Sequence, residues 1–483
     1  MKDHLPPEPR DVTGGRPWTR RELLGALAAA GLPRRGAGAP LPRRVGIAGG
    51  GMAGVSLAWL LDGERDVVLL EARDSIGGNV QSVEVEVDGQ AWVVDVGAQY
   101  FHPGPYPTYV ALLAHLGLYP PATGESHSFP ASITLSAPPS LLPRFVSPVL
   151  PDRLWPVFAG WNRAGLQAFA TAFAAAKARE EADASWGLTL GAWLPTLGLT
   201  RAQWEGMVLP WAASLYSGDV EQARGLSARA AMVFAAKALP DGPAGNLEYF
   251  VLDRGMAEPL RRMADQLTTV EVLTGARVVH VARPPGGGFL VRCADGRSRL
   301  VDDLVFASSG PPTGSLLQAI PGTAAQRAAL QGIEFHDARL MLHTDPAYAP
   351  AEPAFWSFLN CAVRGGSCEA SMWLAPVLTV PPQAPGPGLW KSWVTHRDQE
   401  PSDVLHEAAF RHMLPTPASL LAQGALRALQ GRGGLWFAGG YTLPFDSQET
   451  ALLSALQVAV GLGAAPLRAH ALLGGGIRTS GGR

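Results

Sequence analysis

The stretch that decides the fold is RRVGIAGGGMAGVSLAWLLDGERDVVLLEARDSIGGN, residues 43–79. It begins with a short apolar run, continues with the pattern G-x-G-x-x-G at Gly49, Gly51 and Gly54, and then places apolar residues at helical spacing. In such a pattern the first glycine permits a tight turn, the second admits a pyrophosphate, and the third allows the helix to pack closely on the strand. The stretch therefore predicts strand, turn and helix, with a phosphate held at the helix N-terminus.

A second apolar run, DVVLLEA, follows the predicted helix and ends at Glu71. An acidic side chain at the end of the second strand can accept hydrogen bonds from both hydroxyls of a ribose. An acid at this position favours a ribose without a phosphate. Because strand, turn, helix and acid occur in the required order, the sequence favours a dinucleotide cradle over a flexible glycine-rich loop.

The composition sets the class of protein. The chain has 483 residues, of which 47% are hydrophobic and 17% charged, so a globular protein of two domains is expected. A net charge of -2 gives no reason to expect nucleic acid as a partner. The three cysteines lack the spacing of metal ligands, so no metal site is predicted. A bridge between Cys361 and Cys368 stays open if the protein is exported.

The segment 19–32, TRRELLGALAAAGL, places an arginine pair before an apolar run. The run is shorter than the roughly 20 residues that cross a bilayer, so no transmembrane segment is predicted. The segment resembles a twin-arginine export signal with cleavage near Ala39, which predicts a periplasmic or extracellular protein. Arg34 and Arg35 count against export, and the alternative is a basic leader on a cytoplasmic enzyme.

A glycine doublet, Gly77 and Gly78, comes soon after Glu71. At this point the sequence resembles the flavin-containing amine oxidase superfamily, in which a similar doublet supports the diphosphate of FAD. The family usually follows the doublet with arginine, where this chain has Asn79. The resemblance therefore implies FAD, rather than NAD, with one phosphate contact weakened or supplied from elsewhere.

Two further stretches extend the resemblance. VVDVGAQYFHP, residues 93–103, is similar to the family's segment that meets the flavin ring, and GGLWFAGGYTLPFDSQETALLSALQVA, residues 433–459, is similar to its final strand and helix. In the family, the N-terminus of that last helix points at the flavin, where it can stabilise negative charge on the reduced ring. A third segment implies that the backbone of Val278 meets the adenine.

The resemblance covers about residues 43–465 and is closest to a bacterial branch of predicted FAD-dependent oxidoreductases. The candidate cofactor-binding residues are Gly49, Gly51, Met52, Ala53, Gly54, Glu71, Ala72, Gly77, Gly78, Asn79, Gly97, Ala98, Gln99, Val278, Gly439, Gly440, Glu449, Thr450 and Ala451.

The implied fold is α/β, with a Rossmann-type FAD-binding domain and a discontinuous α+β substrate domain. The expected segments are a leader (1–39), three parts of the FAD domain (40–104, 226–311 and 429–465), a helical and a mixed part of the substrate domain (105–225 and 312–428), and a tail (466–483).

The predicted activity is oxidation of a hydrophobic small molecule by hydride transfer to flavin N5, with O2 or another acceptor taking the electrons. The alternatives are a desaturase or isomerase acting on a lipid-like C–C bond, and a catalytically silent exported flavoprotein. No cysteine lies in the C-terminal cofactor block, so non-covalent FAD is expected.

No catalytic residue is assigned from the sequence. Lys391, His102 and His343 are candidates, but each is more readily explained as a structural group. Ser447 stands near where some family members place a tyrosine of an aromatic pair, which leaves Tyr441 and Trp436 as neighbouring aromatics.

Overall fold

A computed structural model describes residues 22, 23, 25, 43–148, 159–216, 218–238, 247–378, 388–464 and 466–474. The predicted export signal and its cleavage site fall almost wholly outside these residues. Residues 22, 23 and 25 are the exceptions, and the side chain of Leu23 is buried in the core of the first lobe. Within the described ranges, no helix combines the length and apolar character needed to cross a bilayer.

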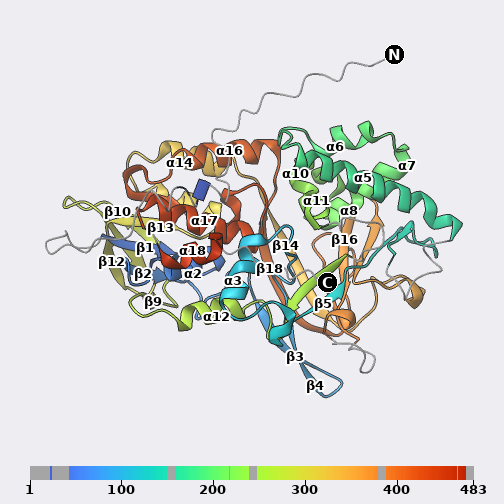
Figure 1. Cartoon of the computed structure of the whole chain (residues 1–483), viewed down its shortest axis with the longest axis horizontal. Coiled ribbons are helices and arrows are strands. Elements are labelled where there is room, and N and C mark those ends of the chain that lie inside the picture. The colour runs from blue at the N-terminus through green and yellow to red at the C-terminus, as the bar shows by residue number, and fades with distance from the viewer. Residues whose placement is uncertain are drawn as a thin grey trace, which may run out of the picture.

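The first lobe is built on a five-stranded sheet in which every pairing is parallel (Figure 1). Its strands, in spatial order, are β19 (Leu435–Phe437), β13 (Asp303–Phe306), β1 (Arg44–Ala48), β2 (Asp66–Leu70) and β9 (Glu271–Leu273). The central strands are continuous apolar runs because both faces of the sheet are covered. The β1–turn–α2–β2 order predicted from residues 43–79 is present.

Helices cover one face of this sheet, and a small sheet with further helices covers the other. On the first face lie α2 (Met52–Leu61), α3 (Pro107–His115), α12 (Glu258–Asp265), α17 (Gln448–Gly461) and α18 (Leu467–Gly474). On the second face lie β10 (Val278–Ala282), β11 (Phe289–Cys293), β12 (Ser298–Val301), α13 (Gly310–Leu317), α14 (Ala324–Gln331) and α16 (Pro417–Arg427).

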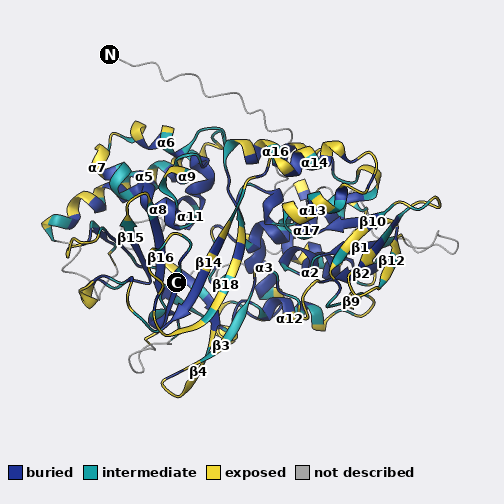
Figure 2. Ribbon diagram, turned by 180° about the vertical axis from the view of Figure 1, so that it is seen from behind, coloured by how far each residue is buried: buried dark blue, intermediate teal, exposed yellow. Residues whose placement is uncertain are grey.

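The second lobe contains a seven-stranded, mostly antiparallel sheet. Its strands, in spatial order, are β18 (Val404–Met413), β14 (Phe335–His343), β17 (Trp390–Trp393), β16 (Ser367–Trp373), β15 (Leu359–Arg364), β6 (Ile133–Ser136) and β7 (Phe145–Val146). The long pair β14 and β18 runs between the two lobes (Figure 1). Figure 2 shows β14 largely buried and β18 with exposed stretches.

A helical layer covers one face of the seven-stranded sheet. It contains α5 (Arg163–Glu181), α6 (Leu190–Trp193), α7 (Arg201–Gln203), α8 (Leu209–Ser214), α9 (Val220–Arg224), α10 (Ala228–Ala231) and α11 (Val233–Ala238), and α15 (Ala375–Leu378) follows β16. The alanine-rich α5 agrees with the high helix propensity of alanine. The segment 105–225, predicted as the helical part of the substrate domain, also contains strands β6 and β7.

Two small antiparallel sheets complete the fold. They pair β3 (Ser82–Val87) with β4 (Gln90–Asp95), and β5 (Ser126–Pro130) with β8 (Glu248–Leu252). The second pair joins a strand from the predicted helical part of the substrate domain to a strand from the predicted second FAD segment. The exact domain boundaries therefore remain a prediction.

Candidate active site

The glycine-rich turn joins β1 to α2 and packs too closely to hold larger side chains. A Cβ at Gly54 would overlap the carbonyl oxygen of Gly49, so the third glycine lets α2 approach the turn. The N-cap of α2 is Gly51, and no side chain caps this helix end. Met52 and Ala53 form the first turn. The free backbone N–H groups at this end are the donors that a phosphate requires.

Glu71 lies directly after β2, at the carboxyl edge of the parallel sheet. Its buried carboxylate accepts hydrogen bonds from the backbone N–H groups of Gly50 (2.5 Å) and Arg73 (2.8 Å). Two backbone donors fix the orientation of the carboxylate, and its remaining lone pairs are available to ribose hydroxyls. Ala72, which follows it, is exposed.

The second glycine pair lies against the first turn. Gly77 donates its N–H to the carbonyl of Gly50 at 2.9 Å. The side chain of Asn79 is exposed. The backbone carbonyl of Asn79 accepts the N–H of Ala98 at 3.0 Å. Arg73 donates from its guanidinium to the carbonyl of Gly78 at 3.0 Å. A cation therefore stands beside the doublet although the family's arginine is replaced; the sequence analysis missed it because Arg73 precedes the doublet.

The predicted ring-facing segment crosses between the lobes. A Cβ at Gly97 would overlap the carbonyl oxygen of Asn79 and lie 3.2 Å from Cε1 of Phe410 on β18. Only glycine fits there. Gln99 is buried, and its Oε1 has no hydrogen-bond partner.

The C-terminal block returns to the same region. Gly439 donates its N–H to Oγ of Ser454 at 2.8 Å, and Gly440 follows as the start of a short turn. Helix α17 packs on α2 and carries Thr450 and Ala451 in its buried first turn. The N-terminus of α17 thus lies next to the helix that bears the first glycine turn.

Glu449 has a structural use that the sequence did not indicate. Its carboxylate accepts the N–H groups of Thr108 (3.1 Å) and Tyr109 (2.7 Å), so it caps the first turn of α3. The side chain therefore points at α3, and only its backbone remains available to a cofactor.

Val278 begins β10 and packs against the core of the second face. Two residues earlier, the N–H of Ala276 donates to the carbonyl of Glu71 at 2.7 Å. This bond brings the predicted adenine-binding strand to the predicted ribose-binding acid.

In the stretches 93–103 and 433–459, three buried polar atoms have no hydrogen-bond partner: Oε1 of Gln99, Nε2 of Gln448 and the hydroxyl of Tyr441. Buried polar groups are almost always hydrogen-bonded in folded proteins, so such a group of orphaned donors and acceptors indicates a polar ligand. A flavin ring carries both donors and acceptors along its edge. The residues present therefore fit FAD.

Lys391 lies on β17 and is buried with only 2% of its surface exposed. Its Nζ donates to the carbonyl oxygen of Asp95 at 2.8 Å, two residues before Gly97. Burial lowers the pKa of Lys391 to about 7, and the charge of Asp95 opposes this shift. Burial also raises the pKa of Asp95 to about 6, against hydrogen bonds from Ser82 and Met256. The lysine therefore supports the flavin-facing segment through the backbone.

The two histidines named from the sequence are held in different ways. Nδ1 of His102 accepts the N–H of Gly104 at 3.0 Å, and burial lowers its pKa. His343 is fully buried, and its Nε2 contacts Oγ of Ser392 at 2.8 Å. Of the two aromatics, Tyr441 is buried beside Phe335, whereas Trp436 donates to Asp303. His102 lies in the same stretch as Gly97, whereas His343 lies on β14.

The sequence analysis missed two other histidines. His336 on β14 and His412 on β18 are direct partners in the strand register, with ring centroids 5.8 Å apart. Nδ1 of His412 lies 3.6 Å from Oδ2 of Asp446. No sequence signal joins these residues, because only the register of two long strands places them together.

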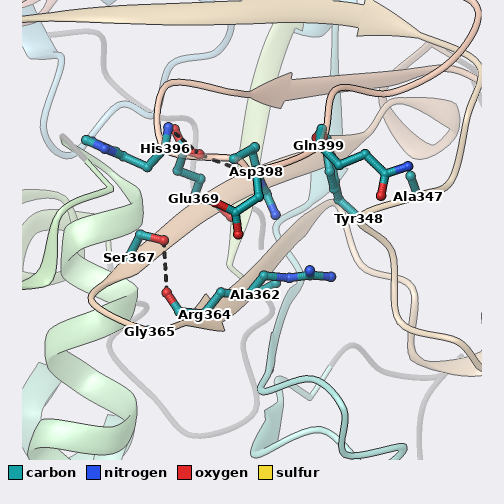
Figure 3. A pocket seen from close by; sticks show the side chains of 11 residues that line it. Ala347, Tyr348, Ala362, Arg364, Gly365, Ser367, Glu369, His396, Asp398 and Gln399 are labelled. Carbon is teal, nitrogen blue, oxygen red and sulfur yellow. Dashed lines mark hydrogen bonds and ion pairs between the residues drawn. The ribbon is translucent and has the colours of Figure 1, made fainter.

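A polar pocket lies away from these residues (Figure 3). Its volume is about 310 Å³, and its lining includes Tyr348, Glu369, His396 and Arg397. Glu369 alternates with Cys368 and Ala370, which pack under the helical layer, so the pocket opens on the other face of the sheet. This face does not carry Phe410, Lys391 or the residues that approach Gly97.

Comparisons with known proteins agree with this arrangement. The family model "Flavin containing amine oxidoreductase" matches residues 52–337, more than half of the chain. An L-amino-acid oxidase from Pseudechis australis is 46% identical over 57 residues, which are 12% of this chain and only 11% of that oxidase.

Three solved structures share the fold across nearly their whole length. A CLA-producing fatty acid isomerase from P. acnes has a TM-score of 0.60 at 13% identity, covering 86% of this chain and 98% of that one. A putrescine oxidase mutant has a TM-score of 0.59 at 15% identity, covering 87% and 99%. Cyclohexylamine oxidase from Brevibacterium oxydans IH-35A has a TM-score of 0.56 at 16% identity, covering 87% and 99%.

These identities show the fold and do not identify a substrate. They confirm the α/β architecture with a Rossmann-type cofactor domain and a second, α+β domain. Together with the family match, they make this chain an FAD-dependent oxidoreductase that belongs to the flavin-containing amine oxidoreductase family.

Proposed function

We propose that this enzyme oxidises a hydrophobic small molecule at a C–H bond, with FAD bound non-covalently and O2 as the electron acceptor. The observation that carries the proposal is the meeting of three remote segments, at Gly51, Gly97 and Gly440, beside orphaned buried polar atoms. When bound, FAD supplies a hydride acceptor at N5.

The chain's own groups hold the cofactor and exclude water. The uncapped N-terminus of α2 and the guanidinium of Arg73 are placed for the diphosphate, and Glu71 is placed for the ribose. Gly97 lets its segment pack against the carbonyl oxygen of Asn79, and Lys391 holds that segment through the carbonyl of Asp95.

The three cysteines support non-covalent binding. Cys293 is buried in the core beside β11, and Cys361 and Cys368 lie in the core under the helical layer. None of them lies in the three segments that approach the ring, so none is placed to form a thioether with it.

Oxidation of a C–N bond is favoured because the family match and two of the three solved structures are amine oxidoreductases. The isomerase among the solved structures keeps a lipid-like C–C bond as the second candidate. We further propose export of the folded holoprotein through the arginine-pair leader, tested by the N-terminal sequence of protein recovered outside the cytoplasm.

The test begins with the visible spectrum of the purified protein before and after heat release of the chromophore. Non-covalent FAD should appear in the supernatant after the protein precipitates. Anaerobic mixing with hydrophobic amines and with unsaturated fatty acids should then bleach the flavin with amines, and peroxide should form when air is admitted. If only fatty acids bleach the flavin, the amine proposal is wrong and the lipid-like C–C bond becomes the leading candidate. Bound FAD that no candidate reduces would indicate a silent flavoprotein.

A further inference from the structure

The histidine pair on β14 and β18 lies between the segments that approach the flavin ring. His412 contacts Phe410, with ring centroids 6.1 Å apart, and Phe410 is the residue that faces Gly97. On its other side, His412 faces Asp446, and Asp446 lies directly against Gly440 of the C-terminal block. The first and third cofactor segments therefore flank the pair.

Each imidazole is held by one ring nitrogen and leaves the other without a partner. His336 hydrogen-bonds to the backbone of Tyr216, and Nδ1 of His412 faces the carboxylate of Asp446. The Nε2 atoms of both rings are buried and have no hydrogen-bond partner. A histidine whose Nδ1 donates to a carbonyl or carboxylate presents a lone pair at Nε2. Two neighbouring positions of β14 and β18 thus each carry a buried ring nitrogen without a partner.

The surroundings of His336 favour a neutral imidazole. Burial lowers the pKa of His336 to about 4, and the neighbouring His412 and His396 lower it further. Hydrogen bonds to the backbone of Tyr216 and Asp337 act in the opposite direction. The carboxylate of Asp337 itself is paired with Arg411, and burial raises the pKa of Tyr216 well above its usual value. A neutral imidazole keeps a lone pair that can accept a hydrogen bond, whereas an imidazolium has none.

We propose that His336 and His412 form a subsite that accepts hydrogen bonds from the substrate. The substrate it takes carries an amine or hydroxyl on the carbon to be oxidised. This inference rests on the proposed function and assigns its substrate class. For an ammonium substrate, a proton passes to Nε2 of His412: the N–H bond breaks, its electron pair stays on nitrogen, and a new N–H bond forms on the imidazole. The carboxylate of Asp446 stabilises the resulting imidazolium.

Two other occupants of this space fit less well. A carboxylate ligand would meet two lone pairs and the negative charge of Asp446, which repel it. Among the described residues, no group of three or more His, Cys, Asp or Glu side chains has the arrangement of a metal site.

The test is equilibrium binding of three hydrophobic probes that share one cage: 1-adamantylamine, 1-adamantanol and 1-adamantanecarboxylate. The carbon that bears the amine or hydroxyl has no hydrogen, so neither probe can be oxidised there. Binding is followed by titration calorimetry on the FAD-containing protein at pH 8. The amine and the alcohol should bind, and the carboxylate should bind at least tenfold more weakly.

The variants separate a direct role from a structural one. His412→Phe keeps the aromatic contacts and should weaken amine binding about tenfold or more, with the FAD content unchanged. His336→Gln should do the same, and Asp446→Asn should weaken the amine more than the alcohol. His280→Gln, an exposed histidine on β10, is the matched control and should bind all probes as the unaltered protein does.

Several outcomes overturn the inference. One is amine affinity that stays within twofold in both histidine variants; another is a carboxylate that binds more tightly than the amine. Absence of amine binding by unaltered, FAD-containing protein does so as well. These results leave the oxidase proposal intact if the same preparations still form peroxide, whereas a preparation that takes up no FAD refutes the oxidase proposal itself.

Discussion

The two faces of the seven-stranded sheet differ in how far their polar side chains are paired with one another. On the back face, Nε2 of His343 contacts Ser392, which contacts Ser371, and the buried Glu369 lies 3.5 Å from Arg397. Nδ1 of His343 has no hydrogen-bond partner. On the face toward the cofactor segments, His336 and His412 each leave Nε2 without a partner. His336 and His343 even lie on the same strand.

This contrast separates structural polarity from polarity available to a ligand. A buried polar network that is satisfied by its own members stabilises one arrangement of the sheet. Orphaned acceptors cost free energy unless something else binds them. The residue type alone does not distinguish the two cases, whereas the partners do.

The largest effect is expected for Gly97→Ala on the cofactor face. The added methyl would overlap the carbonyl oxygen of Asn79, so the segment must move and the protein should be purified without flavin. The ratio of absorbance near 450 nm to protein absorbance measures this. Gly366→Ala, in the β15–β16 turn where a Cβ meets nothing within 4 Å, is the control and should keep its FAD. Full FAD content in Gly97→Ala would show that the ring lies elsewhere.

The next effect is expected on the back face, for Glu369→Ala. The carboxylate is 3% exposed and accepts the N–H groups of Thr395 and His396. Its loss leaves Arg397 buried without its counter-charge, which should cost about 3–5 kcal/mol of unfolding free energy. Denaturant unfolding measures the loss, while the flavin spectrum should not change. Glu407→Ala, in the exposed pair with Arg339, should cost less than about 1 kcal/mol.

Lys391→Met should change how stability depends on alkaline pH. The ordinary pKa of lysine is 10.5, and burial lowers it to about 7 in the folded chain. Between these values the unfolded chain binds more protons, so the stability of the unaltered protein rises with pH. Methionine removes this rise. The melting temperature of the variant should therefore fall further below that of the unaltered protein as the pH increases from 7 to 10. Parallel pH profiles would show that Lys391 is charged throughout.

The smallest effect is expected for His343→Gln on the back face. Burial lowers the pKa of His343 from 6.5 to about 4, so its contribution to stability is present above pH 6.5 and is lost as the pH falls toward 4. The variant should be less stable by about 1 kcal/mol at pH 7.5 because the bond to Ser392 is weakened. Thermal melts should show this gap narrowing at pH 4.5. A gap that widens in acid would contradict the assignment.

The local parts of the fold were predictable from the sequence, and the distant pairings were not. The turn at Gly49–Gly54 and the acid at Glu71 follow from a pattern within one short stretch. The bond from Glu449 to α3 and the pairing of His336 with His412 join residues far apart in the chain. Such contacts depend on the register and packing of whole elements, which no local pattern encodes.

The segment 105–225, predicted as helical, shows a second limit of prediction from the sequence. Alanine-rich periodicity correctly indicated α5, but the neighbouring ITLS segment forms β6 because it pairs in parallel with β15, more than two hundred residues later. Ile133 and Thr134 favour a strand, and the pairing with β15 supplies its partner.

The parallel sheet places its last strand, β19, beyond β13, and α17 returns to pack on α2. During synthesis the ribosome therefore releases the first glycine turn long before the residues that complete the ring site exist. A nascent chain stopped before residue 435 has the diphosphate turn but lacks the end of the cradle. The proposed cofactor site therefore needs β19 and α17 in place, and FAD uptake should begin only after these elements have been synthesised.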